Sequence, residues 1–314
     1  VVGMSLSGIS VQPQQLLTKG ALYGAILLGA WFYHKRGASR LVCPLLIVFW
    51  LGLFSDLHIF PMFVAGRQGV PFQDHLLASF DRWLGIETPE VMAALARVPW
   101  LQSLLHHSYG TLVFLLTAAV LLPSLLNRMQ AAKELLISCV LAVLLCFPIF
   151  AVFQAHGPWV YYGYEPSVNQ DAYMSVFASL KQAPHFVMDL RYRNGLICFP
   201  SFHTILAVLA GVALWAIPIA RWLGVTWSTL IVTSTVTTGT HYLVDVLAGL
   251  AVVALSVTGA KLWSRWESKR NQQQEEANGD VKQSHRDRST SPCGSKRQVR
   301  SAVHSPYDSS HAVG

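Results

Sequence analysis

The sequence predicts an all-α fold: a polytopic transmembrane bundle of six or seven spans, with interfacial amphipathic helices and a disordered C-terminal tail. Three observations lead to this prediction. Of the 314 residues, 53% are hydrophobic and only 12% are charged, whereas a soluble domain carries about 25% charged residues. Apolar runs of transmembrane length recur along the chain. From Asn271 onward the sequence is almost free of apolar residues, which is typical of a disordered segment.

Composition divides the chain into three segments. Residues 1–19 form a short N-terminal segment, residues 20–263 the transmembrane domain, and residues 264–314 a disordered basic tail. Between Lys261 and Gly314 there are ten Lys and Arg against six Asp and Glu, so +4 of the net charge of +7 lies there. A basic tail beside a final apolar run favours the cytoplasmic side of a membrane. Because the chain shows no groove-reading motif, we expect no nucleic-acid partner.

The first two apolar runs predict two spans. Gly20–Tyr33 is followed at once by the bases His34-Lys35-Arg36. A signal peptide carries its positive charge before the apolar core, so this run is predicted to be a first span with cytoplasmic bases. Leu41–Phe54 is predicted to be the second span. If the first run does not cross, the bundle has six spans.

Residues 66–107 interleave charged and apolar residues, and Thr88 or Pro89 begins a second short helix. In the first helix of this segment the large apolar residues share one helical face: Leu76, Phe80, Trp83 and Leu84. The charged residues of that helix lie elsewhere: Asp74, Asp81 and Arg82. This amphipathic pattern predicts helices that lie in the membrane interface or pack over the bundle.

The remaining apolar runs predict five further spans: Tyr109–Leu126, Glu134–Gln154, Phe199–Ile219, Val225–Thr240 and Tyr242–Trp263. The long loop before the last three of them begins with GPWVYYGYEP, which resembles an interfacial aromatic belt. In this arrangement the bases of the 34–40 and 128–133 loops, Arg221 and the tail fall on one side, which is predicted to be the cytoplasm, and residues 66–107 and 155–197 lie outside. We therefore expect an integral protein of the plasma (inner) membrane, with a cytoplasmic C-terminus and a site that faces outward.

The FPSFHT stretch begins a predicted helix with groups that suit an anion. Pro200 suits the first turn of a helix and Ser201 suits its cap. The unpaired N–H groups of a helix start attract anions, and His203 lies in this first turn. The alternative is an ordinary helix start with a histidine that reaches the membrane interface.

The THYLVDVLAG stretch combines a second histidine with a carboxylate. His241 and Asp245 are four residues apart, so we expect them on one helical face within hydrogen-bonding distance. A carboxylate bonded to one ring nitrogen makes the other nitrogen more basic, which prepares an imidazole to act as a nucleophile or base. The alternative is a structural pair that holds a helix end. The two motifs together, both at outer helix ends, favour a catalytic role.

The five cysteines are widely scattered and show no zinc-like spacing, so we expect neither a disulfide framework nor a metal cluster. Cys139 and Cys146 are two turns apart on one predicted helix and are predicted to be small buried residues. Only Cys198 lies near the proposed site.

GLICFPSFHT followed by THYLVDVLAG resembles the type 2 phosphatidic acid phosphatase superfamily, and more narrowly its inositol phosphorylceramide synthase-like (inositolphosphotransferase) branch. The resemblance covers roughly residues 185–260, and DRWLGIETPE is similar to the same branch. It implies that His241 attacks phosphorus to form a phosphohistidine, that Asp245 supports it, and that His203 protonates the leaving alkoxide. It also implies that Ser201 and the helix start hold phosphate oxygens.

Two positions depart from the phosphatases of that superfamily. Phe202 stands where they usually have Gly, and Thr235, six residues before the second histidine, stands where they have Arg. The inositolphosphotransferase-like branch commonly shows both departures. Arg191 and Arg193 are then the candidates for phosphate binding, because a guanidinium group binds phosphate in a bidentate manner.

We therefore predict a membrane enzyme, either a phosphatidic acid phosphatase-type hydrolase or an inositolphosphotransferase-like transferase. Its substrate is a membrane lipid phosphate ester, its acceptor is water or a polyol such as inositol, and it needs no metal or other cofactor. A transporter or proton-relay protein using the same residues is an alternative, although such proteins place ionisable residues near span centres. A metallohydrolase with His203, His241 and Asp245 as zinc ligands is another.

Overall fold

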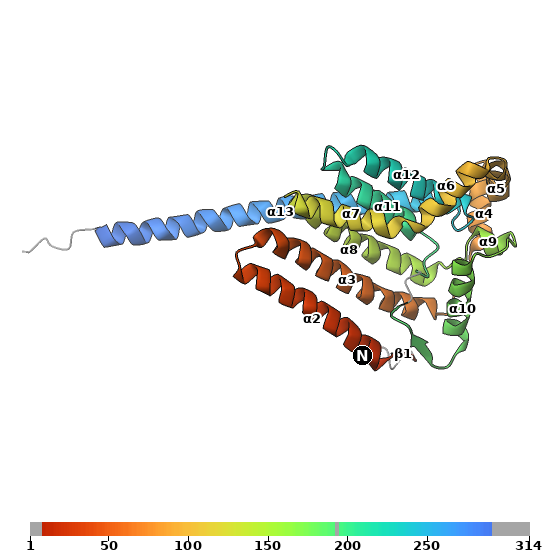
Figure 1. Ribbon diagram of the computed structural model, residues 1–314, viewed down its shortest axis with the longest axis horizontal. Helices are drawn as coiled ribbons and strands as arrows, with labels where there is room; N and C mark the ends of the chain where they lie inside the picture. The colour runs from red at the N-terminus through yellow and green to blue at the C-terminus, as the bar shows by residue number, and fades with distance from the viewer. Residues whose placement is uncertain (1–7, 192–194, 291–314) are drawn as a thin grey trace, which may run out of the picture. The chain divides into compact units, whose positions relative to one another are not determined.

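The computed structural model describes residues 8–191 and 195–290. Apart from two strands of three residues each, the regular elements of these residues are helices, which confirms the predicted all-α fold (Figure 1). The chain forms two compact units, Val1–Ser264 and Arg265–Gly314. The helical bundle and the candidate site belong to the first unit.

Several helices are long and apolar enough to cross a membrane. Four pass this test individually: α2 (Pro13–Lys35), α3 (Ser39–Gly66), α8 (Met129–Val152) and α13 (Leu243–Thr290). Two more meet at a bend of 55° and make a fifth crossing if they form one span: α6 (Pro99–Gly110) and α7 (Leu112–Leu125). The remaining bundle helices are α11 (Phe202–Trp215) and α12 (Arg221–Thr237). They are 14 and 17 residues long, shorter than the roughly 20 residues that usually cross a bilayer. A total of six or seven spans stays a prediction.

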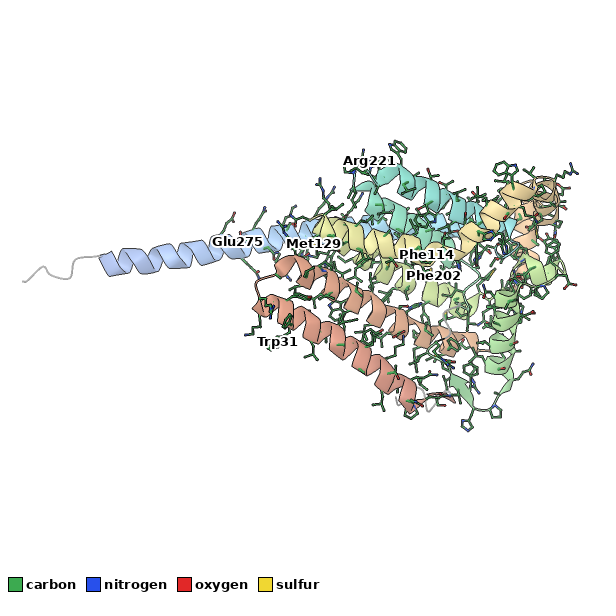
Figure 2. All side chains as sticks on the ribbon, in the orientation of Figure 1. Trp31, Phe114, Met129, Phe202, Arg221 and Glu275 are labelled. Atoms are coloured by element: carbon green, nitrogen blue, oxygen red, sulfur yellow. The ribbon has the colours of Figure 1, made fainter. Side chains whose placement is uncertain are left out.

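Large apolar side chains cover the outside of the bundle. Trp31 on α2 is 59% exposed and Phe114 on α7 is 64% exposed, and both are labelled in Figure 2. Water disfavours extensive apolar surface of this kind. The exposed faces of these helices therefore fit contact with lipid.

Two boundaries differ from those predicted. The predicted span Tyr109–Leu126 begins inside α6, and the chain bends at Thr111, whose hydroxyl accepts a hydrogen bond from the Trp227 indole (2.7 Å). Disorder was expected from Asn271, but α13 continues as a helix to Thr290. Its Gln, Glu, Lys and Arg residues have high helix propensity, which sustains a helix without an apolar face. The rest of the predicted tail lies outside the described residues.

Three short helices lie at the end of the bundle opposite the α2–α3 turn (Figure 1). They are α4 (Asp74–Trp83), α5 (Thr88–Ala96) and α9 (Pro158–Tyr161). The start of α5 at Thr88 is as predicted. Of these helices, α4 bonds through Asp81 to the start of α13, and α9 contributes Trp159 to the lining of the cavity described below.

The amphipathic helix α4 turns its charged face inward. Asp74 and Asp81 are 8% and 1% exposed, whereas Phe80 and Trp83 are 54% and 81% exposed. The physical reason is that both carboxylates accept hydrogen bonds from backbone N–H groups of other segments. The apolar face of α4 remains uncovered, in agreement with the interfacial position that its sequence predicts.

The long connection between α8 and α11 is partly ordered by regular structure. It contains α9, α10 (Val168–Gln182) and β2 (Phe186–Met188), which pairs in parallel with β1 (Ile9–Val11). Ser167 caps α10 with a capping box: its hydroxyl oxygen accepts from the Gln170 N–H, and the Gln170 side-chain oxygen accepts from the Ser167 N–H. The pairing of β1 with β2 joins the segment before α2 to the connection that leads into the FPSFHT stretch.

The main core lies between α7, α8, α11 and α12 and is built largely from small and branched residues. Cys139 and Cys146 on α8 are buried there, as predicted. Gly211 lets α11 and α12 approach closely, because an added Cβ would lie 2.5 Å from Ser228 Oγ. The Ser228 hydroxyl donates to the Ala207 carbonyl across this contact (2.7 Å). This contact joins α11, which carries His203, closely to α12.

Candidate active site

The FPSFHT stretch folds into a capped helix start. Ser201 is fully buried, and its Oγ accepts hydrogen bonds from the Thr204 N–H (3.3 Å) and the Thr204 hydroxyl (3.0 Å). The Ser201 N–H donates to the backbone carbonyl of Asp245 (3.0 Å). This last bond joins the start of α11 directly to the start of α13, so the two sequence motifs meet in space.

His241 and Asp245 are in contact, but they do not share a helical face as predicted. His241 lies in the turn before α13, and Asp245 lies in the first turn of that helix. Asp245 Oδ2 accepts a hydrogen bond from the Tyr242 N–H (2.9 Å) and lies 3.4 Å from His241 Nδ1. The His241 N–H donates to the backbone carbonyl of Thr235 (3.0 Å). The carboxylate therefore caps its own helix and contacts the ring at the same time.

His203, in the first turn of α11, lies near His241. Its ring centroid is 6.0 Å from that of His241. The ring of Tyr109, from α6, stacks on His203 at 4.5 Å between centroids, and the Tyr109 hydroxyl lies 3.4 Å from His203 Nδ1. The stacking restricts the rotation of the His203 ring and leaves its other nitrogen for a ligand.

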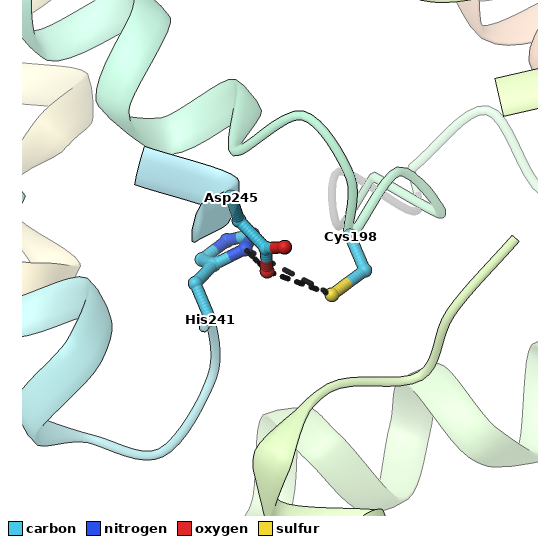
Figure 3. Close-up of side chains that lie close together, drawn as sticks. All are labelled: Cys198, His241 and Asp245. Atoms are coloured by element: carbon cyan, nitrogen blue, oxygen red, sulfur yellow. Dashed lines mark hydrogen bonds and ion pairs between the residues drawn. The ribbon is translucent and has the colours of Figure 1, made fainter. Parts of the chain in front are cut away.

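Cys198 completes a buried cluster with the His–Asp pair (Figure 3). Its Sγ lies 3.4 Å from Asp245 Oδ2 and 3.9 Å from His241 Nδ1. The exposed fractions of the three residues are 5% for Cys198, 2% for His241 and 0% for Asp245. The sequence placed Cys198 near the site, but it did not show this contact.

A cavity of about 900 Å³ is lined by both His203 and His241. Its described lining contains six histidines: His58, His106, His107, His156, His203 and His241. Polar residues from the start of α10 line another part of it, among them Asn169 and Gln170. Among the described lining residues there is no Lys or Arg. The cavity is much larger than a phosphate group and has room for a substituted phosphate ester.

Burial determines the protonation state of His241. It lowers the pKa of this residue to about 4, and a hydrogen bond to the backbone of Cys198 opposes the shift. The imidazole is therefore neutral near pH 7. A neutral ring held through Nδ1 presents Nε2 as a nucleophile or base.

Two further carboxylates hold the segment that carries His241. Asp81 accepts from the N–H groups of Leu243 (2.8 Å) and Val244 (2.9 Å), so α4 caps the start of α13. Burial raises the pKa of Asp81, and these two hydrogen bonds oppose the rise. Asp74 accepts from the Gly157 N–H (2.8 Å) and from the Tyr242 hydroxyl (3.2 Å). The sequence did not identify either residue as part of the site, because their partners are distant along the chain.

The predicted phosphate-binding residues have different positions. Ser201 is adjacent to His203, but its hydroxyl is used as the helix cap. Arg191 forms a bidentate pair with Asp189, in which Nη2 donates to Oδ2 (2.7 Å) and Nε donates to Oδ1 (3.0 Å), and its side chain is 83% exposed. Arg193 lies outside the described residues. Neither Ser201 nor Arg191 is among the described residues that line the cavity, and the role of all three residues in phosphate binding stays a prediction.

A comparison with protein families matches the part of the chain that forms this site. The model described as the PAP2 superfamily matches residues 75–259, more than half of the chain. The matched range includes the histidine and carboxylate cluster and most of α4. No curated protein and no solved structure matches the chain.

Proposed function

The chain belongs to the PAP2 superfamily, whose members are generally phosphatases, and we propose that it is an integral membrane lipid phosphoesterase or phosphotransferase that acts through a phosphohistidine. The observation that carries this proposal is the arrangement of the two histidines. Both line one cavity with ring centroids 6.0 Å apart, and the buried carboxylate of Asp245 contacts the ring of His241. This arrangement supplies a nucleophile and an acid on opposite sides of a phosphorus atom.

In the first step, His241 Nε2 attacks the phosphorus of a membrane lipid phosphate ester. A nitrogen–phosphorus bond forms and the bond from phosphorus to the lipid oxygen breaks. His203 donates a proton to the departing oxygen. Asp245 stabilises the positive charge that develops on the His241 ring.

In the second step, an acceptor hydroxyl attacks the phosphorus of the phosphohistidine while His203 takes the proton of that hydroxyl. An oxygen–phosphorus bond forms, and the bond from phosphorus to His241 Nε2 breaks, which returns His241 to its neutral form. Water as acceptor gives a phosphatase, and an alcohol such as inositol gives a phosphotransferase. The size of the cavity and its polar lining by Asn169 and Gln170 support an acceptor larger than water. This lining favours the transferase reaction.

Phosphate oxygens need positive or hydrogen-bonding partners in both steps. We propose Ser201, Arg191 and Arg193 for this role. Gly195, which lines the cavity, is only two residues beyond Arg193. The start of α11 next to His203 provides further N–H groups that suit an anion.

The site is proposed to face outward from the plasma (inner) membrane, with the C-terminus in the cytoplasm. The α2–α3 and α7–α8 turns lie at one end of the bundle and α4, α5 and α9 at the other (Figure 1). The first end carries Lys35, Arg36 and Arg128. Positive connections of this kind usually remain on the cytoplasmic side.

The test is a turnover assay with the purified full-length protein in detergent. Labelled lipid phosphates are supplied with and without inositol and ceramide. Phosphate release without an acceptor indicates a phosphatase, and a new inositol-containing lipid indicates a transferase. A base-stable, acid-labile label on the protein indicates the phosphohistidine.

The variant His241→Ala is expected to lose both turnover and label. His34→Ala, which changes an exposed histidine at the other end of the bundle, is the matched control and is expected to keep both. Full turnover in His241→Ala, or a label that survives in it, contradicts the mechanism.

A further inference from the structure

Cys198, His241 and Asp245 place three different metal-binding atoms together. Sγ and Oδ2 are 3.4 Å apart, Nδ1 and Oδ2 are 3.4 Å apart, and Sγ and Nδ1 are 3.9 Å apart. The three residues come from two segments more than forty positions apart in the sequence. All three side chains are buried, so the cluster is not an accidental meeting of mobile surface groups.

These separations are close to those around a tetrahedral zinc ion. Zinc binds sulfur at about 2.3 Å and nitrogen or oxygen at about 2.0–2.1 Å, which at the tetrahedral angle places neighbouring ligand atoms about 3.3–3.6 Å apart. Two of the three observed distances already have this value. The third needs to shorten by only a few tenths of an ångström.

The charges around the cluster favour a cation. A thiolate and a carboxylate neutralise a divalent ion, which suits a buried site. The carboxylates of Asp81 and Asp74 lie beside the segment that carries His241 and Asp245: Asp81 accepts from the Leu243 N–H (2.8 Å), and Asp74 accepts from the Tyr242 hydroxyl (3.2 Å). Among the described residues that line the cavity there is no Lys or Arg whose positive charge would repel the ion.

An ion has a way in and an additional ligand atom. Cys198 and His241 both line the cavity of about 900 Å³, so an ion that enters it reaches them directly. Asp245 Oδ1 is buried and has no hydrogen-bond partner among the described residues. This oxygen is therefore available for a second bond from the carboxylate to the ion.

We propose that Cys198, His241 and Asp245 form a binding site for a thiophilic divalent cation such as Zn²⁺, and that the bound ion inhibits the enzyme. The inhibitory part rests on the proposed function. When Nδ1 binds the metal, the neutral ring carries its proton on Nε2, so Nε2 has no free electron pair with which to attack phosphorus. The thiol proton of Cys198 leaves as the sulfur–metal bond forms.

This site differs from the zinc site that the sequence allowed as an alternative. His203 lies across the cavity, with its ring 6.0 Å from that of His241, and Cys198 takes its place as the third ligand. The ion thus lies behind the nucleophile, on the side of Asp245, and not between the two histidines. From this position it blocks the reaction and does not activate water for it.

Binding is tested with Co²⁺ as a spectroscopic probe for the metal-free, full-length protein in detergent. A thiolate ligand gives a sulfur-to-cobalt charge-transfer band in the near ultraviolet. We expect this band in the wild-type protein at one ion per chain, its displacement by Zn²⁺, and its loss in Cys198→Ser. Cys43→Ser, which changes an exposed cysteine on α3, is the matched control and should keep the band. A wild-type protein without the band, or a band that persists in Cys198→Ser, overturns the site.

Inhibition is tested by titrating Zn²⁺ into the lipid phosphate turnover assay. The activity of each variant is expressed relative to its own activity without Zn²⁺. The Zn²⁺ concentration that halves this activity should be at least about 10-fold higher in Cys198→Ser, because loss of a residue that merely supports a metal ligand already weakens metal binding by about that factor. Equal sensitivity of the two proteins, or activation by Zn²⁺, overturns the inhibitory role. A protein that shows the cobalt band but turns over no lipid phosphate contradicts the proposed function and supports the metal site.

Discussion

At the scale of single residues, the site depends on how His241 is held. Its ring contacts Asp245 and Cys198, and its backbone N–H donates to Thr235. Thr235 occupies the position where the phosphatases resembled by this chain have Arg. Thr235 holds His241 through its backbone carbonyl. Its hydroxyl donates to the carbonyl of Val232 (2.7 Å).

The protonation of His241 leads to a prediction about pH. Because burial lowers its pKa to about 4, the neutral nucleophile is present above that pH and is lost as pH falls through it. We expect kcat/KM, which reports the free enzyme, to stay level on the acid side well below the ordinary histidine pKa of about 6.5. The measurement needs a phosphodiester substrate, since a phosphomonoester ionises with a pKa of about 6 itself.

The control for this profile is recovery of activity after return to neutral pH, which separates titration from unfolding. An acid limb near the ordinary histidine pKa, with full recovery, contradicts a buried neutral nucleophile.

At the scale of elements, α4 connects the membrane interface to the catalytic segment. Its apolar face, with Phe80 and Trp83, is exposed, while Asp74 and Asp81 on the opposite face bond to the segments on both sides of the cavity. Amphipathic periodicity identified the helix correctly. It did not show which face is buried, because helix capping between distant segments reverses the usual preference for buried apolar residues.

The cap that Asp81 provides leads to a prediction about rate. Asp81→Ala leaves the N–H groups of Leu243 and Val244 without their acceptors, which lets the start of α13 shift. We expect kcat to fall by about 10- to 100-fold, the cost of a displacement of about 1 Å, with little change in KM. Asp81→Asn keeps one acceptor oxygen and should retain more activity than Asp81→Ala.

The matched control is Asp171→Asn, an exposed acid in the first turn of α10. Thermal unfolding of each variant is measured in parallel, and removal of a helix cap should cost about 0.5–2 kcal/mol of stability. Equal kcat in Asp81→Ala and the wild-type protein would show that α4 does not position the site.

At the scale of the whole molecule, the bundle separates its basic connections from its site. The α2–α3 turn lies at one end of the bundle, and α4, α5 and α9 lie at the other (Figure 1). This separation is the structural basis for the proposed orientation. Asp245 is tolerated in this apolar stretch because it lies at a helix start, where the Tyr242 N–H donates to its carboxylate and the helix dipole favours a negative charge.

The orientation is tested by labelling with a membrane-impermeant maleimide in intact cells. In a background with Cys43→Ser and Cys293→Ser, Glu165→Cys in the connection before α10 should react from outside. Arg128→Cys, in the turn between α7 and α8, is the counterpart and should react only after the membrane is opened. Both positions are exposed. The reverse pattern contradicts an outward-facing site.

The sequence by itself determined the helical membrane fold, the approximate positions of the long helices, and three residues of the candidate site: His203, His241 and Asp245. It could do so because hydrophobic runs and short motifs are local properties of the chain. Only the tertiary structure decided that His241 precedes its helix and that Cys198 and Asp81 meet the same helix start. The Asp81–Leu243 bond joins residues 162 positions apart, and a contact at that separation depends on how whole helices pack.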